Sequence, residues 1–386
     1  MTDVRLTVSA GAHDRLHCPV SVLVPGERLP SPERIVLRKG RAAVPCQVAV
    51  EGDHVRLTWI VSKLGAGREC AYDVSEGRRT GARTGVVLTD EPGTRVGVQV
   101  NGELLTHYYY AATYARPFLH PLIGPYGKSV TRCYPLPGFG GDEKQDHPHH
   151  KSVWSAWGDL NGTDNWSEEP GHGRQTHRGF EAMESGPVYG RIVARNDWVS
   201  RDGEKVCEEV REIRIYSLPS ALRMIDYTVS FLATEAPLRF GDTKEGGILS
   251  VRVASSMDVP VGGTITNSFG GRDEAETWGK RAHWCDYSGP VGGQSVGIAI
   301  LDHPGNFRHP TYWHVRNYGL MTANPFGVSH FKSDAAQNGS HTVAKGQTFG
   351  FRYRLLVHAG GAAEIDIAER YHDFINPPAV DGNTGP

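Results

Sequence analysis

The hydrophobic and polar positions of the first 80 residues predict a series of short strands. Apolar and polar residues alternate from Val4, and the apolar run 20–24 ends at Pro25-Gly26. Further short apolar runs follow at residues 35–37, 44–50 and 55–59. Strands of this length, separated by polar turns, are typical of an antiparallel β-sandwich. We therefore expect a small immunoglobulin-like domain over residues 1–80.

The rest of the chain has longer alternating runs, which predict a larger antiparallel domain over residues 86–378. Asn101-Gly102 separates two such runs, and this dipeptide favours a hairpin because both residues readily adopt positive φ. Later runs with one apolar and one polar face lie at residues 211–216, 223–231, 249–253 and 349–357. Two large stacked sheets require strands of this kind. A charged, glycine-bearing connector at 75–85 would separate the two domains.

One segment has helical periodicity instead. Ile367, Tyr371 and Phe374 fall at i, i+4 and i+7, and Pro377-Pro378 ends the run. We expect a helix there and a disordered tail over residues 379–386. The predicted fold class is all-β: a small N-terminal immunoglobulin-like β-sandwich, then a large antiparallel β-supersandwich, with one C-terminal helix.

The composition agrees with this pattern and excludes several classes of partner. The 386 residues include 47 glycines, 24 prolines and 15 tyrosines, as expected for a β-protein with many turns. The formal net charge is −2, so no electrostatic feature favours a nucleic-acid or membrane partner. No apolar run approaches the length of a membrane span. The sequence leaves a homo-oligomer open.

The N-terminus and the cysteines indicate a reducing compartment. Residues 1–5 lack the basic start and apolar core of a signal peptide, so we expect a cytoplasmic protein. The six cysteines are far apart and form no CxxC pair, which favours buried thiols over a zinc ribbon or a redox motif. Residues 138–141 lack the strand–turn–helix context of a dinucleotide loop, and no G-x-S-x-G elbow occurs. NAD, ATP and a serine nucleophile are therefore not expected.

The main candidate for chemistry is the segment Asp146-His147-Pro148-His149-His150, which precedes an apolar run. This pattern predicts a loop that leads into a strand and presents its side chains at a rim, where functional residues usually lie on a β scaffold. On an extended segment His147 and His149 would point one way and His150 the other. Two such imidazoles can bind one metal ion, or act as acid and base on one ligand. The alternative is a histidine-rich surface loop.

Two further segments carry candidate residues. Glu245 precedes the apolar strand 248–253, and Arg252 lies on its polar face, where an arginine can fork onto a carboxylate or paired hydroxyls. The alternative is a surface turn with an exposed ion pair. Residues 301–318 mix His, Arg, Trp, Tyr and Asn, as in sites where aromatic faces cover a sugar ring and polar groups bind its hydroxyls. A buried aromatic cluster with satisfied histidines is the alternative there.

Four pieces of the sequence resemble a known bacterial family. They read DHPHHKSVWSAWGDLNGTDNW, DTKEGGILSVRV, WGKRAHWCDYSG and LDHPGNFRHPTYWHVRNYGLMTANPFG. Together they span roughly residues 90 to 375 and resemble the PmoA-like family, which has no known function. The methane-oxygenase label of that family does not fit a chain without a membrane span. The β pattern is similar to the supersandwich of galactose mutarotase and several polysaccharide lyases, in which histidine, arginine and an acid handle a sugar on a concave sheet face.

These observations predict a cytoplasmic carbohydrate-active enzyme that acts on a glycoside or modified sugar by His/Glu acid–base chemistry. The reaction would be hydrolysis, elimination or epimerisation, because a histidine near its reference pKa transfers protons at neutral pH. The expected catalytic residues are His147, His149, His150, Glu245 and His314. The expected substrate-binding residues are Arg252, His303, Trp313, Arg316 and Trp154.

Two alternatives to this hypothesis stay open. One is a metal-dependent version of the same site, in which His147, His149 and His303 are the candidate ligands of a divalent metal. The other is a protein that binds a saccharide without turning it over. Each form of the enzyme requires the histidine loop, Glu245 and His314 to meet in one concavity.

Overall fold

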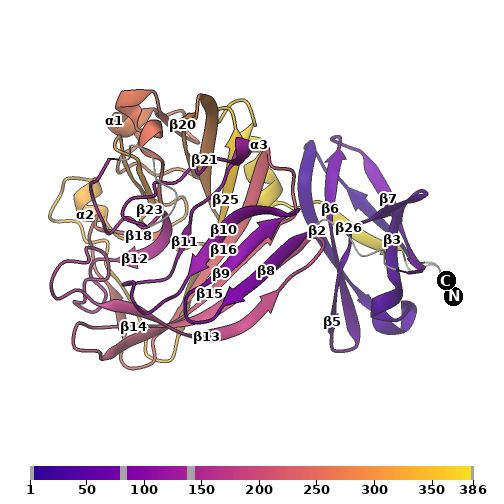
Figure 1. The fold of residues 1–386 in the computed structure, drawn as a ribbon, viewed down its shortest axis with the longest axis horizontal. Helices are drawn as coiled ribbons and strands as arrows, with labels where there is room; N and C mark the ends of the chain where they lie inside the picture. Colours follow the sequence, from indigo (N-terminus) through magenta and orange to yellow (C-terminus); the bar gives the residue numbers. More distant parts are fainter. Residues whose placement is uncertain (1–3, 79–84, 137–143, 384–386) are drawn as a thin grey trace.

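The computed structural model describes residues 4–78, 85–136 and 144–383. Most of these residues lie in antiparallel strands, and the helices are short. Two eight-stranded sheets form the larger part of the molecule, and sheets of five and three strands form a smaller unit beside them (Figure 1). The all-β sandwich fold predicted from the sequence is confirmed.

The smaller unit is a two-sheet sandwich. Its five-stranded sheet contains, in order, β26 (Ala379–Asn383), β1 (Val4–Ser9), β7 (Glu69–Glu76), β3 (Ile35–Lys39) and β4 (Ala42–Val44). Its three-stranded sheet contains β2 (Arg15–Pro25), β6 (His54–Leu64) and β5 (Gln47–Glu51). Alternate residues of both sheets, among them Leu6, Val8, Leu57 and Trp59, form one buried apolar cluster. The period-2 pattern of the first 80 residues therefore produces the expected sandwich.

The C-terminal segment completes this sandwich. Residues 379–383 form β26, the yellow strand within the indigo unit of Figure 1, and pair with β1 so that Val380 lies opposite Val8. The predicted disordered tail is therefore wrong for these residues, because their backbone groups pair with an edge strand that would otherwise be open. Residues 384–386 of that tail and residues 79–84 of the predicted connector lie outside the described residues. The domain boundary at the connector stays a prediction.

The two large sheets face each other across one core. The first large sheet contains, in order, β22 (Trp313–Arg316), β23 (Leu320–Ala323), β18 (Gly246–Arg252), β12 (Val153–Trp157), β11 (Phe118–His120), β10 (Glu103–Tyr109), β9 (Arg95–Val100) and β8 (Val86–Glu91). The second contains β13 (Arg174–Glu184), β14 (Tyr189–Val199), β15 (Lys205–Tyr216), β16 (Leu222–Leu232), β25 (Thr348–Ala359), β21 (Gln294–Asp302), β20 (Trp284–Val291) and β19 (Thr264–Asn267). Their inner faces share a single buried cluster that includes Val98, Val251, Tyr227 and Val357. The predicted pair of stacked sheets follows from this alternation.

The predicted hairpin lies at its expected place in the first large sheet. Strands β9 and β10 pair through the turn Asn101-Gly102, whose φ angles are 55° and 85°. An asparagine and a glycine tolerate these left-handed conformations, which other residues adopt only with strain.

The first large sheet has a second, outer face with its own side-chain row. Across the strands, His314 lies opposite Thr322, Thr322 opposite Ser250, and Ser250 opposite Trp154. Directly opposed residues of an antiparallel sheet point to the same face. Trp154 packs there in an aromatic cluster separate from the core, together with Trp166 and Leu320. The residues that could carry chemistry therefore lie on the face turned away from the second sheet.

The C-terminal helix predicted from periodicity is α3 (Ile367–Ile375). It lies between the larger part of the molecule and the smaller unit, and in Figure 1 it is beside β2. Arg15 of β2 forms a buried ion pair with Asp373 of α3 at 3.2 Å, and Arg370 donates to the backbone oxygen of Leu16 at 2.9 Å. None of the helices in the described ranges combines the length and the apolar character of a membrane span.

The inner core contains a buried ion pair whose loss should destabilise the fold. Glu209 and Arg211 of β15 are fully buried, and Glu209 accepts from Arg211 Nε and from Trp198 Nε1, each at 2.6 Å. The substitution Glu209→Ala leaves an uncompensated buried guanidinium, so we expect the free energy of unfolding to fall by about 3–5 kcal/mol. Urea unfolding followed by circular dichroism measures the change.

The matched control is Glu181→Ala. Glu181 also pairs with an arginine of the second large sheet, Arg195, but both side chains are about half exposed. Exposed pairs of this kind contribute no more than about 1 kcal/mol. Equal losses from the two substitutions would show that burial of the Glu209–Arg211 pair does not matter to stability.

Candidate functional site

The histidine loop reaches the outer face of the first large sheet immediately before β12. Its backbone turns at His147, whose φ is 47°, and the N–H of His150 donates to the carbonyl of His147 at 3.0 Å. The segment is therefore a tight turn and not an extended strand. The predicted arrangement, with His147 and His149 on one side and His150 on the other, is wrong for this reason.

Aromatic stacking fixes the loop on the sheet. The rings of Tyr318, His147, His150 and Trp154 form a column with successive centroid distances of 4.8, 4.9 and 5.4 Å. The interplanar angles along this column are 9°, 7° and 23°, so the rings are nearly parallel. His149 lies edge-on to His150 at 4.3 Å. Trp154 is completely buried and is the base of the column.

Two buried arginines hold the column in place. Arg252 of β18 donates from Nη1 to His150 Nδ1 at 2.6 Å and from Nη2 to Asp146. Arg132 donates to the same Asp146 oxygen at 2.8 Å and to Asp258 at 2.8 Å. Asp146 therefore bridges both guanidinium groups. Burial raises the pKa of its carboxyl, but Arg252 and Arg132 outweigh burial and lower the pKa below its ordinary value.

The bond from Arg252 fixes the tautomer of His150. Burial lowers the pKa of Arg252 to about 10, so its guanidinium stays protonated at neutral pH and can only donate. His150 Nδ1 must therefore accept, and its proton lies on Nε2. Burial, with the charges of His149 and Arg252, lowers the pKa of His150 well below its ordinary value. No hydrogen bond joins its Nε2–H to another of the described residues.

His314 has the opposite tautomer. It lies on β22, and its Nδ1 donates to the backbone oxygen of Lys244 at 2.6 Å, since a carbonyl can only accept. Its Nε2 is therefore an acceptor, and no described residue hydrogen-bonds to it. Burial lowers the pKa of His314 to about 4. The imidazole is neutral at pH 7 and has a fixed orientation.

Glu245 directly precedes β18. Its carboxylate forms an ion pair with Lys244 at 2.6 Å, and about half of its side chain is exposed. Burial raises the pKa of Glu245, but Lys244 outweighs that effect, and the charges of His314 and His149 lower the pKa further. Burial, followed by the charge of Arg116, lowers the pKa of His149 to about 4. Glu245 and His314 therefore act on each other's pKa, and His149 also acts on the pKa of Glu245.

The structure thus brings together five of the predicted residues from segments far apart in the sequence. They are His147, His149, His150, Glu245 and His314. Arg316 lies two residues after His314 on the same face, forms an ion pair with Glu274 at 2.9 Å and covers the ring of Tyr318. About a third of its side chain is exposed, so it remains a candidate for ligand binding.

Trp313 and His303 lie elsewhere: the core position of Trp313 contradicts its predicted substrate-binding role, and the structure does not bring His303 to the other candidates. Trp313 directly precedes His314 on a strand, so it points to the opposite face, where its indole is buried in the inner core and donates to Ala282. His303 follows β21 of the second large sheet and packs edge-on against Phe374 of α3 at 5.3 Å.

Arg252 and Trp154 lie at the site but do not face a ligand. The guanidinium of Arg252 is 1% exposed and is engaged by His150 and Asp146, and Trp154 lies beneath His150. Their predicted contact with substrate is corrected to a supporting role: both residues position His150.

The site also contains residues that the sequence did not single out. Lys151 is buried and donates to Glu168 at 2.9 Å, while Arg116 donates to the backbone oxygen of His149 at 3.0 Å. Asp146 and Tyr318 lie within the segments that the sequence indicated, although no role was predicted for either residue. Arg116 and Arg132 had no signal in the sequence, because only the folded sheet brings them to the loop.

The predicted metal set does not form. His303 is held against α3, and the rings of His147 and His149 meet edge to face with centroids 5.8 Å apart. Across residues 4–78, 85–136 and 144–383, no group of three or more His, Cys, Asp or Glu side chains is arranged to hold a metal ion.

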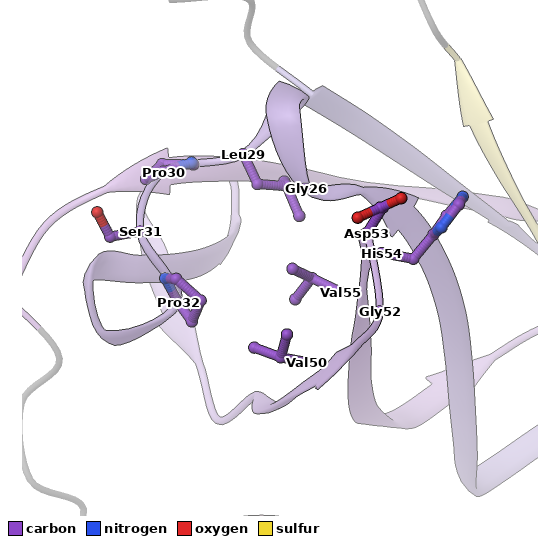
Figure 2. A pocket seen from close by; sticks show the side chains of 10 residues that line it. All are labelled: Gly26, Leu29, Pro30, Ser31, Pro32, Val50, Gly52, Asp53, His54 and Val55. Carbon is purple, nitrogen blue, oxygen red and sulfur yellow. The ribbon is translucent and has the colours of Figure 1, made fainter.

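A hollow of about 410 Å³ lies away from this site, in the smaller unit (Figure 2). It is lined by Gly26, Leu29, Pro30, Ser31, Pro32, Val50, Gly52, Asp53, His54 and Val55. Its titratable residues, Asp53 and His54, are exposed, and the figure shows their side chains at one edge of the hollow. None of the candidate catalytic residues lines it, so it offers no comparable chemistry.

Comparison with known proteins identifies the family of the chain. The model of a family of unknown function (DUF6807) matches residues 95–372, which include every residue of the site. The chain therefore belongs to this family. The description of the family names no activity and does not include the PmoA label of the resemblance. No curated protein shows a significant match.

The chain also shows a distant likeness to solved structures. One of them is a protein in glycosyl hydrolase family 38 from Enterococcus faecalis, with a TM-score of 0.45 and 10% sequence identity. The match covers 99% of this chain and 47% of that protein, so the chain spans about half of its length. A likeness at this level carries no weight for the function of this chain.

The charge of Arg252 should control the protonation of His150. Because this guanidinium lowers the pKa of His150, the substitution Arg252→Met should raise that pKa, and Arg252→Lys should raise it less. Nitrogen-15 NMR titration of the histidines measures the pKa and reports the tautomer. In the unsubstituted protein we expect the proton of His150 on Nε2 and that of His314 on Nδ1.

Arg195→Met is the control, because Arg195 is an exposed arginine of the second large sheet. It should leave both histidines unchanged. An unchanged pKa of His150 in Arg252→Met would contradict the assigned contact.

Proposed function

We propose that this member of the family of unknown function is a carbohydrate-active enzyme that uses His/Glu acid–base chemistry on a glycoside or modified sugar. The observation that supports it best is a pair of neutral imidazoles of opposite tautomer on the outer face of the first large sheet. His150 offers an N–H held by Arg252, and His314 offers a lone pair held by Lys244. Two oriented imidazoles of opposite tautomer are a donor and an acceptor for proton transfer.

The surroundings of this pair suit a polyol. Glu245, Lys244 and Arg316 are partly exposed and can contact hydroxyl or carboxylate groups. Tyr318, at the end of the stacked column, and Trp278, edge-on to His314 with centroids 6.4 Å apart, supply aromatic faces for the C–H side of a ring. Trp278 was not selected from the sequence. In this proposal it replaces Trp313 as the aromatic residue beside His314.

A binding protein without turnover is the second candidate, favoured by the many ion pairs that already engage the charged groups. The two candidates differ in one result. An enzyme converts the saccharide to a product on long incubation. A binding protein gives a heat of saccharide binding in calorimetry but forms no product. A metal-dependent enzyme would also lose turnover in chelator and regain it on addition of zinc or manganese.

Turnover should depend on the neutral form of His314. Its pKa is about 4, so the neutral form dominates above that pH and is lost as pH falls through it. We therefore expect kcat/KM to show no decrease from pH 7 to about pH 5 and to decrease near pH 4. A pH–rate profile at constant ionic strength measures this. A decrease centred near pH 6.5 would indicate an unperturbed histidine and would contradict the assignment.

Substitution of His314 or Glu245 should lower turnover without destabilising the fold. Purified protein is screened by NMR against glycosides, uronic-acid glycosides and keto sugars. His314→Gln and Glu245→Gln should lower kcat by about 10²- to 10⁴-fold, the usual contribution of acid–base groups, while the melting temperature changes little. The matched control is His303→Gln, the same change in a histidine that packs against α3, and it should keep full turnover. Equal activity of all three variants would refute the proposed site.

A further inference from the structure

We infer that the site removes a proton from a carbon next to a carbonyl group of its sugar, so that the reaction is an elimination or an epimerisation and not a hydrolysis. This inference rests on the proposed function and narrows it. The substrate is then a sugar that carries a ketone, aldehyde or carboxylate beside the reacting C–H bond.

The carboxylates of the site do not suit glycoside hydrolysis. Hydrolases usually pair two carboxyl groups, one of which stays protonated to donate to the leaving oxygen. In the described part of the site each carboxylate is paired with a cation. The pairs are Glu245 with Lys244, Asp146 with Arg132 and Arg252, Glu168 with Lys151 and Arg116, Asp258 with Arg132, and Glu274 with Arg316.

Asp258 is the carboxyl of this set whose pKa lies above its ordinary value, because burial outweighs Arg132 and Arg252, and it is in the wrong place for a general acid. Asp258 accepts from Arg132 at 2.8 Å and is nearly buried beneath the loop. The open carboxylate, Glu245, has a lowered pKa and is ionised at neutral pH. Within residues 85–136 and 144–383, the site therefore presents no carboxylic acid to a glycosidic oxygen.

The histidines suit a different reaction. His150 can donate from Nε2 and cannot accept at Nδ1, because Arg252 occupies that nitrogen. His314 can accept at Nε2 and cannot donate from it, because its proton lies on Nδ1. Both histidines lie on the outer face of the first large sheet. A neutral imidazole N–H that polarises a carbonyl, together with an oriented base that deprotonates the neighbouring C–H, is the combination this reaction needs.

The steps balance without any co-reactant. His314 Nε2 takes the proton, the C–H electron pair forms a C=C bond, and the carbonyl π pair moves to oxygen. The resulting enolate oxygen accepts from His150 Nε2–H. In elimination the β C–O bond then breaks, and the protonated His314 returns its proton to the leaving oxygen. In epimerisation a proton from solvent adds to the opposite face of the carbon, His314 releases its proton to solvent, the carbonyl re-forms and no C–O bond breaks.

The charge that stabilises protonated His314 comes from Glu245. The groups that face His314 are Glu245, Lys244 and Arg316 from neighbouring segments, and His150 from the loop. The backbone oxygen of Lys244, which accepts from Nδ1, and the carboxylate of Glu245 both raise the pKa of His314 against the effect of burial, and of the charged side chains only Glu245 favours the imidazolium. Glu245 is in this scheme a positioning charge, and it need not touch the reacting carbon.

Two kinds of sugar carry the required carbonyl, and one experiment separates them. The complete protein is incubated in D₂O with a keto sugar, with a uronic-acid glycoside and with a neutral glycoside that has neither group. Proton NMR follows loss of the C–H signal next to the carbonyl, and absorbance near 235 nm follows unsaturated uronate products. We expect exchange or elimination with one of the two carbonyl sugars and no reaction of the neutral glycoside.

The variants test the roles within this reaction. His314→Gln should abolish exchange, and Glu245→Gln should slow it and move the acid limb of its pH profile to lower pH, because the pKa of His314 falls further. His303→Gln should behave as the unsubstituted protein. A purely structural role of Glu245 would slow exchange without moving the acid limb, which would overturn its assignment.

The remaining outcomes separate the two proposals. Hydrolysis of the neutral glycoside without any C–H exchange would overturn this inference and leave the carbohydrate-active enzyme standing. Saccharide binding without conversion of any of the three sugars would overturn both.

Discussion

The arrangement of the site depends on one carboxylate shared by two buried arginines. Asp146 accepts hydrogen bonds from Arg132 and from Nη2 of Arg252, and Nη1 of Arg252 donates to His150. Buried guanidinium groups are costly unless each is paired, so this bridge ties the loop to β18. The loop is further fixed because His150 stacks on Trp154 of the adjacent strand. Polar pairing and ring stacking together leave the imidazoles little freedom.

This fixation explains why the histidines of the site are neutral. Burial lowers the pKa of His149, His150 and His314, and nearby cations lower it further. A neutral imidazole has one donor and one acceptor, and its backbone or arginine partner decides which nitrogen has which role. Two histidines with opposite partners therefore acquire opposite roles although their chemistry is the same. The assignment of donor to His150 and acceptor to His314 follows from these partners alone.

Most of the fold could be predicted from the sequence because the strands of this chain alternate regularly. The hairpin at Asn101-Gly102, the stacked sheets and the helix near Tyr371 were all predicted from local periodicity. The strand β26 could not be predicted, because residues 379–383 become a strand only when they reach the edge of β1.

For the site, the sequence predicted the residue types better than their orientation. Strand parity places Trp313 and His314 on opposite faces, and taking it into account would have excluded Trp313 from the ligand-binding set. The turn at His147 and the remote arginines Arg116 and Arg132 depend on tertiary contacts that no local pattern contains.

The central claim is that the histidine loop and His314 of β22 form one reaction centre on the outer face of the first large sheet. The most direct test is a crystal structure of the protein with a bound keto sugar or uronic-acid glycoside. The account predicts that one sugar lies within hydrogen-bond distance of both His150 Nε2 and His314 Nε2. A sugar bound instead in the hollow of the smaller unit, with both imidazoles uncontacted, would contradict it.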